Sequence, residues 1–186
     1  MAYRLNLRAL SVASALLALN VGLAKSAALL SLPLFLDSVG TLIGGALLPA
    51  PYVVGVAVMT SLLGGLVIHP AFPFYVGTQV VIALLSLLAV RRGLLSKWWS
   101  SILVGVAIGI MAAVVSAPVT AVVFGGVTLG GATAINALLL ATGRSVWKAV
   151  VAGSLFVEML DKPAAALLAH LAILRLPDRF LRAARS

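Results

Sequence analysis

The sequence predicts an all-α integral membrane protein, and three observations lead to this prediction. Of its 186 residues, 63% are hydrophobic and only 9% are charged. A soluble domain is normally about half apolar and about a quarter charged, so this chain has too little polar surface to cover a globule in water. The apolar residues also stand in long unbroken runs rather than in short alternating strands, which favours helices over a transmembrane barrel.

Breakers and charges divide the chain into six apolar runs, each compared with the roughly 20 residues that a spanning helix needs. The first run follows Arg4 and Arg8, and we interpret it as a retained helix because it is longer than the apolar region of a signal peptide. The prolines of residues 49–51 end the second run, residues 69–70 end the third, and residues 91–93 end the fourth. The predicted six-helix bundle, a single domain over residues 1–186, has helices at 9–30, 34–48, 52–68, 72–90, 99–124 and 145–174.

Residues 125–143 lie between the fifth and sixth predicted helices. They are rich in glycine and threonine at first and have a helical pattern over 132–141. This stretch is short and broken by glycines, so we predict a structured outer loop with a short helix, packed on or into the membrane.

Six spans place both termini on one side of the membrane, and the basic residues decide which side. Nine of them fall at the ends assigned to the cytoplasm and three fall near the outer ends, which predicts cytoplasmic termini in a multi-pass plasma-membrane protein. The net charge of +9 is then explained by anchoring in the bilayer, and no nucleic-acid partner is expected. The inner set is Arg4, Arg8, Arg91, Arg92, Lys97, Arg175, Arg179, Arg182 and Arg185, and the outer set is Lys25, Arg144 and Lys148.

Ionisable side chains are costly inside a membrane, so the few present are informative. Glu158 precedes Asp161 by three residues and Lys162 by four, which places them side by side on a helix. One interpretation is an internal ion pair between Glu158 and Lys162 that fixes packing, and the other is that Glu158 reaches a substrate. Asp37 also has two interpretations, as the N-cap of the second helix or as a pocket residue at its outer end.

Several uncharged residues have the same ambiguity. Asn20 and Gln79 fit either hydrogen bonds between helices or a ligand pocket. Phe72, Phe74 and Tyr75 fit either an aromatic belt at the membrane interface or a surface that stacks on a flat ligand.

The sequence gives no sign of catalysis. It has no cysteine, which excludes thiolate metal sites and cysteine nucleophiles. Metalloprotease, P-loop and nucleophile-elbow motifs are missing, so we expect no catalytic residue, no metal site and no cofactor. The alternative in this class is an intramembrane enzyme that uses Glu158 and Asp161.

Small residues recur at a spacing of four on the first predicted helix. Ala9 and Ala13 form such a pair, which permits close approach of another helix in lipid. This helix would be either a neighbour in the same chain or a helix of a second membrane subunit.

Taken together, these features resemble the substrate-binding S components of energy-coupling factor (ECF) vitamin transporters. The resemblance covers nearly the whole chain and includes its size, its six spans and its inward termini. It also rests on LFLDSVGTL at 34–42, GGALLP at 44–49, SAPV at 116–119, FGGVT at 124–128, DK at 161–162 and LP at 176–177.

The resemblance implies an uptake system in which the chain binds a vitamin or a similar polar heterocycle at the outer face. A transmembrane coupling subunit would dock at Ala9 and Ala13, and two cytosolic ATPases would supply energy. A membrane sensor or interaction module is the alternative. Both signs of charge are present, so the sequence does not define the ligand's charge. The predicted pocket residues are Asn20, Asp37, Phe74, Gln79, Asn136, Arg144 and Glu158.

Overall fold

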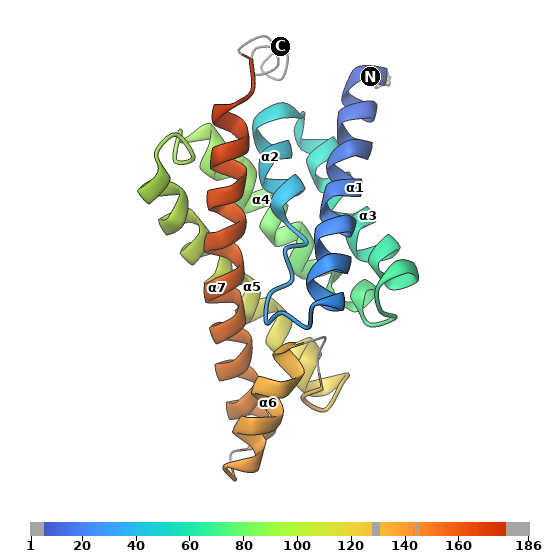
Figure 1. The fold of residues 1–186 in the computed structure, drawn as a ribbon, viewed down its shortest axis with the longest axis vertical. Helices are drawn as coiled ribbons and strands as arrows, with labels where there is room; N and C mark the ends of the chain where they lie inside the picture. Colours follow the sequence, from blue (N-terminus) through green and yellow to red (C-terminus); the bar gives the residue numbers. More distant parts are fainter. Residues whose placement is uncertain (1–5, 128–130, 144, 178–186) are drawn as a thin grey trace.

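A computed structural model describes residues 6–127, 131–143 and 145–177, and helices dominate these residues. The all-α prediction is therefore confirmed. Figure 1 shows the helices in chain order. They are α1 (Leu7–Leu29), α2 (Val39–Leu47), α3 (Ala50–Val67), the 3-10 turn η1 (Phe72–Tyr75), α4 (Val76–Arg91), α5 (Trp98–Val122), α6 (Gly131–Ala141) and α7 (Val146–Leu174).

Four helical segments are long and apolar enough to cross a membrane. They are α1, α3, α5 and the continuous segment Phe72–Arg91, which joins η1 to α4. Helix α7 has 29 residues, but all its 18-residue stretches contain Glu158, Asp161 and Lys162. Helix α2 has only nine residues. The structure therefore agrees with a membrane-embedded helical protein, and four of the six predicted spans meet the length and hydropathy criteria.

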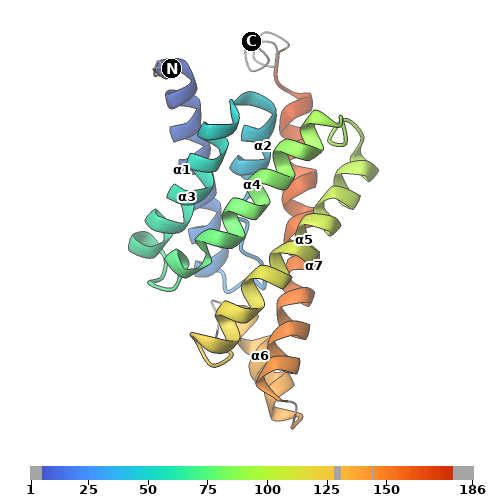
Figure 2. The same ribbon diagram turned by 180° about the vertical axis from the view of Figure 1, so that it is seen from behind.

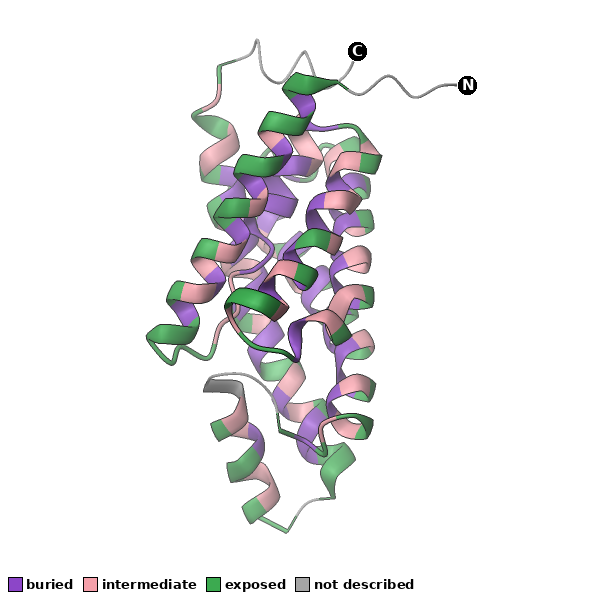
Figure 3. Ribbon diagram, turned by 90° about the vertical axis from the view of Figure 1, so that its right-hand side faces the viewer, coloured by how far each residue is buried: buried purple, intermediate pink, exposed green. Residues whose placement is uncertain are grey.

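The outer surface of the bundle carries many large apolar side chains. Leu66 is 84% exposed, Leu7 is 75% exposed and Val122 is 73% exposed. Figure 3 shows buried residues on the inner faces of the helices and exposed residues on the outer faces. So much exposed apolar surface is unusual for a soluble monomer and suits contact with lipid.

Local signals explain where the helices begin and end. Helix α1 starts after Asn6, whose Oδ1 accepts hydrogen bonds from the backbone N–H groups of Arg8 and Ala9. Helix α3 carries Pro51 in its first turn, where a missing N–H removes no helical hydrogen bond. After α4, Gly93 has a φ of +68°, which reverses the chain before α5.

The second predicted helix is too long at its beginning. Residues 32–36 are not helical, and Leu36 has a φ of +50°. The N-cap of α2 is Ser38, and its side chain makes no capping hydrogen bond. The capping interpretation of Asp37 is therefore wrong, because this side chain forms an ion pair with Lys162 instead.

Helices α5 and α7 form the most extensive helix pair of the bundle. Two glycines of α5 permit the close approach. A Cβ on Gly105 would collide with the backbone of Pro163, and a Cβ on Gly109 would lie 2.7 Å from the carbonyl oxygen of Glu158. The beginning of α1 and the end of α7 lie at one end of the molecule, together with the α4–α5 connection (Figures 1 and 2).

Ala9 and Ala13 are buried in the chain's own core and are each 8% exposed. Their assignment to a partner-docking surface is therefore corrected, because helices of this chain already cover them. The exposed face of α1 carries a different row of small residues, namely Ser11, Ala15, Ala18 and Gly22.

Candidate functional site

A cavity lies between the segment that precedes α2 and the helices that follow it. Helix α7 supplies Glu158, Lys162 and a glycine, and the segment before α2 supplies Asp37. Helices α3, α4 and α5 supply polar side chains, and η1 supplies two aromatic rings. Helix α6 contributes one asparagine. The lining residues are Phe35, Asp37, Ser61, Phe72, Tyr75, Thr78, Gln79, Ile82, Ser116, Thr120, Asn136, Gly153, Ser154, Val157, Glu158 and Lys162.

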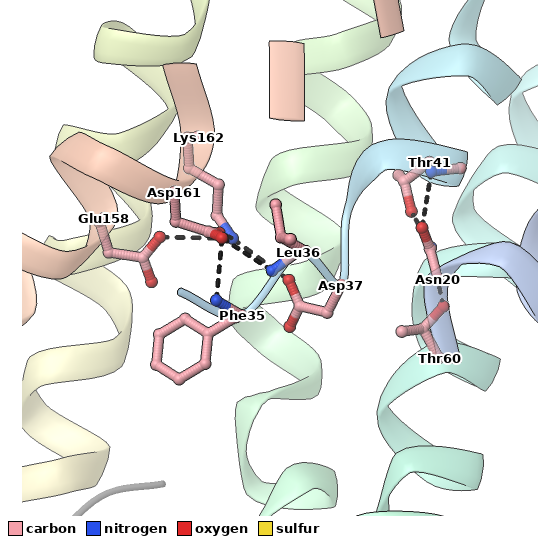
Figure 4. A network of polar contacts seen from close by, with 10 residues as sticks. Asn20, Phe35, Leu36, Asp37, Thr41, Thr60, Glu158, Asp161 and Lys162 are labelled. Carbon is pink, nitrogen blue, oxygen red and sulfur yellow. Dashed lines mark hydrogen bonds and ion pairs between the residues drawn. The ribbon is translucent and has the colours of Figure 1, made fainter. Parts of the chain in front are cut away.

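Lys162 is the centre of the charged part of the site (Figure 4). Its Nζ lies 2.6 Å from Asp161 Oδ2, 3.2 Å from Asp37 Oδ1 and 3.4 Å from Glu158 Oε2. All four side chains are buried. A buried ammonium group needs such partners because its removal from water costs several kcal/mol.

Asp161 connects α7 to the non-helical segment before α2. Its Oδ1 accepts hydrogen bonds from the backbone N–H of Phe35 at 2.9 Å and of Leu36 at 2.7 Å. These bonds hold the segment in the left-handed turn at Leu36 and bring Asp37 to Lys162. Asp161 therefore positions other groups of the site and does not itself line the cavity.

Five buried polar atoms on the cavity wall have no hydrogen-bond partner among the described residues. Buried polar groups are normally paired, so each exception needs an explanation. Glu158 Oε2 lies near Lys162 Nζ, but the contact lacks hydrogen-bond geometry. The unpartnered atoms are Ser61 Oγ, Thr78 Oγ1, Gln79 Oε1, Asn136 Oδ1 and Glu158 Oε2.

Asn136 reaches the cavity because Gly153 has no side chain. Its Nδ2 donates to the carbonyl oxygen of Gly126 at 3.0 Å, which fixes the amide orientation. A Cβ at position 153 would collide with Asn136 Oδ1. The short helix α6 is thus attached to α7 at the cavity wall.

Aromatic side chains form the remaining part of the wall. Tyr75 stacks on Phe124 with ring centroids 6.1 Å apart, and its hydroxyl lies 2.8 Å from Thr120 Oγ1. Phe72 is buried against Gly64. The cavity has a volume of about 50 Å³. Small-molecule pockets usually span about 300–1,000 Å³, so a ligand of vitamin size requires movement of the lining side chains.

The cavity contains four of the seven predicted pocket residues: Asp37, Gln79, Asn136 and Glu158. Phe74 does not line it, because this ring is 55% exposed and packs edge-on against Phe124. The residues of the predicted aromatic group that do line the cavity are its neighbours in η1. Arg144 lies outside the described residues.

Asn20 also lies outside the cavity lining. It is fully buried and donates from Nδ2 to Thr41 Oγ1 at 2.9 Å and to Thr60 Oγ1 at 3.0 Å. Its Oδ1 accepts from the backbone N–H of Gly40 at 2.6 Å. Of its two predicted roles, the interhelical hydrogen bonds are the one that the structure contains, and the assignment to the pocket is corrected.

Sequence reasoning missed the hydroxyl residues of the wall and the central place of Lys162. The spacing of Glu158 and Lys162 did indicate their ion pair, which the structure confirms at 3.4 Å. No local signal joins Asp37 to Lys162, because the two are 125 residues apart in the chain.

The acidic side chains of the site are organised around an ammonium group. In the part of the chain that the structure describes, no group of three His, Cys, Asp or Glu side chains is arranged to hold a metal ion. The three acids surround an ammonium group instead.

No protein-family model, curated protein or solved structure matches this chain.

Proposed function

We propose that this protein is the membrane-embedded binding subunit of an uptake transporter of the ECF type, and that it binds a small polar molecule. The observation that carries the proposal is the set of unpartnered buried polar atoms on the wall of one cavity. A cavity that combines apolar surface with convergent polar groups is typical of a ligand site. A ligand that bonds these atoms would offset the cost of leaving them unpaired.

In this proposal the bundle crosses the plasma membrane six times, with both ends in the cytoplasm. The basic residues support this orientation. Arg8, Arg91, Lys97 and Arg175 lie near the end of the molecule where α1 begins and α7 ends. Helix α7 crosses with its charges turned inward, where Glu158, Asp161 and Lys162 neutralise one another in part.

The chain has no ATPase motif, so ATP-driven uptake needs partner subunits. We propose a transmembrane coupling subunit and two cytosolic ATPases, as in the family that the sequence resembles. The exposed row of small residues on α1, which includes Ala15 and Ala18, is the proposed contact. A smooth helix face permits close helix approach in lipid.

Native mass spectrometry of the purified full-length chain tests the binding function. We expect a retained small molecule that is lost in the Gly153→Ala variant, whose new methyl group displaces Asn136 from the cavity wall. Gly55→Ala is the matched control, because nothing lies within 4 Å of a Cβ there. A chemically altered molecule would instead favour the intramembrane enzyme. Purified wild-type protein that retains no small molecule would contradict the proposal.

Co-purification tests the partners separately. We expect Ala15→Trp and Ala18→Trp to reduce recovery of a coupling subunit and ATPases at least about fivefold, because a bulky ring prevents close helix approach. Leu103→Trp is the control, since Leu103 is 59% exposed on α5 and distant from α1 in the chain. Equal recovery for all three variants would contradict the proposed docking face.

A further inference from the structure

The charge of the cavity is opposite to the charge of the chain. The sequence carries 13 lysines and arginines against four aspartates and glutamates. Three of these four acids, Asp37, Glu158 and Asp161, surround the single ammonium group of Lys162. In the ionised state the cluster has three negative charges against one positive charge.

Lys162 cannot serve an anionic ligand without giving up its present partners. Its side chain is only 2% exposed and is bonded to Asp161 and Asp37. No other lysine or arginine appears among the described residues that line the cavity. A ligand carboxylate or phosphate would therefore face Asp37 and Glu158 with no free cation to receive it, and like charges in a buried site repel strongly.

The unpartnered atoms on the wall are mostly hydrogen-bond acceptors. Glu158 Oε2 accepts when the carboxylate is ionised. Asn136 presents its oxygen, because its Nδ2 is already bonded to Gly126. The hydroxyl groups of Ser61 and Thr78 both donate and accept, so they do not oppose this preference. These acceptors come from separate elements, which suits a ligand with several N–H groups.

We infer that the site binds a small organic cation with N–H donors, of the amine, amidine or guanidine class. The positive group lies against Glu158 and Asp37, and the apolar part of the ligand lies against Phe35, Phe72 and Tyr75. This inference rests on the proposed binding function and adds the charge of the substrate to it. The cation would balance the excess negative charge of the cluster, and each buried acceptor would gain a donor.

Three probes of nearly equal shape test the charge preference: benzamidinium, benzamide and benzoate. Their dissociation constants are measured on the full-length protein in detergent by isothermal titration calorimetry. We expect benzamidinium to bind at least about tenfold more tightly than benzamide, a difference of about 1.4 kcal/mol. Benzoate should bind most weakly of the three.

Glu158→Gln identifies the residue responsible. The substitution keeps the shape and removes one of the three negative charges, while Lys162 retains Asp161 at 2.6 Å and Asp37 at 3.2 Å, so we expect the variant to fold. The substitution should weaken the affinity for benzamidinium at least about fivefold and leave the affinity for benzamide nearly unchanged. Lys148→Gln, at an exposed position on α7, is the control for a change in net charge.

Any of three outcomes would overturn the inference: benzamide or benzoate binding as tightly as benzamidinium, an unchanged benzamidinium affinity in Glu158→Gln, or no binding by any probe. None of these results decides the proposed function, because that depends on the molecule retained in mass spectrometry. A retained neutral or anionic compound would leave the binding function standing and would reject the cation.

Discussion

Asn20 and Glu158 are both buried polar residues, and they differ in how far their hydrogen-bonding groups are paired. Asn20 makes three hydrogen bonds, to Thr41, Thr60 and the backbone of Gly40. Glu158 has an oxygen with no hydrogen-bond partner on the cavity wall. A satisfied polar group fixes packing, while an unsatisfied one remains available to a ligand.

The bond from Gly40 to Asn20 also replaces a missing helix cap. Gly40 lies in the first turn of α2, where backbone N–H groups have no partner within the helix. The N-cap residue Ser38 makes no side-chain capping bond there. Asn20 Oδ1 on α1 accepts from Gly40 instead, and α1 approaches so closely that a Cβ on Gly40 would collide with the carbonyl oxygen of Leu16.

Asn20→Leu should therefore destabilise the bundle. The substitution removes three hydrogen bonds and leaves the N–H of Gly40 unpaired, at an expected cost of about 2–4 kcal/mol. Unfolding in mixed detergent micelles measures this cost. Ser26→Ala is the control on the same helix, because the Ser26 hydroxyl donates to the Gly22 carbonyl one turn earlier and the residue is exposed. A loss of ligand binding with unchanged stability would contradict the structural role.

For single residues, the sequence identified the polar groups of the site but not the residues that they contact. It singled out Asp37, Gln79, Asn136 and Glu158 because polar groups are rare in an apolar chain. It could not distinguish Asn20 from these residues, because the hydrogen-bond partners of the Asn20 side chain are 20 to 40 positions away in the chain. The choice between a packing role and a pocket role needs tertiary structure.

At the scale of the helices, the close packing of α5 against α7 positions the charged residues of the site. Gly109 of α5 packs against the backbone of Glu158, and Gly105 packs against Lys162 and Pro163. The position of the charged cluster therefore depends on two residues without side chains on a neighbouring helix.

Gly109→Ala should move α7 away from α5 and displace Glu158. Overpacking of this kind costs about 1–3 kcal/mol, and we expect a loss of ligand affinity of about tenfold or more in the protein that still folds. Thermal unfolding and the binding assay for benzamidinium measure the two effects. Gly55→Ala meets open space within α3 and should be neutral or stabilising by up to about 1 kcal/mol. Equal behaviour of the two variants would show that the close packing is unimportant.

Most helix boundaries were predictable because breakers mark them. The prediction of 99–124 compares with Trp98–Val122, and that of 145–174 compares with Val146–Leu174. The exception is α2, which starts at Val39 rather than at residue 34. Asp161 holds the preceding segment in a non-helical form through the N–H groups of Phe35 and Leu36, and this long-range effect has no signal in the local sequence.

For the whole molecule, the distribution of charge is consistent with both the proposed topology and the proposed cationic ligand. Most of the described basic residues lie near one end, where α1 begins, α7 ends and α4 joins α5. Three of the four acids lie instead in the interior, around Lys162. A cation arriving from the other side would meet an acidic site without passing the basic end of the bundle.

The absence of cysteine makes this topology directly testable, since one introduced cysteine is the only thiol of the chain. Ser96→Cys places it in the α4–α5 connection, and Thr142→Cys places it near the α6–α7 connection at the other end; both residues are exposed. The positive-inside rule predicts that a membrane-impermeant maleimide labels the Thr142→Cys variant in intact cells. It should label the Ser96→Cys variant only after the cells are permeabilised. Labelling of both from outside, or the reverse pattern, would contradict six crossings with cytoplasmic termini. The unsubstituted chain is the control, and it should remain unlabelled in both conditions.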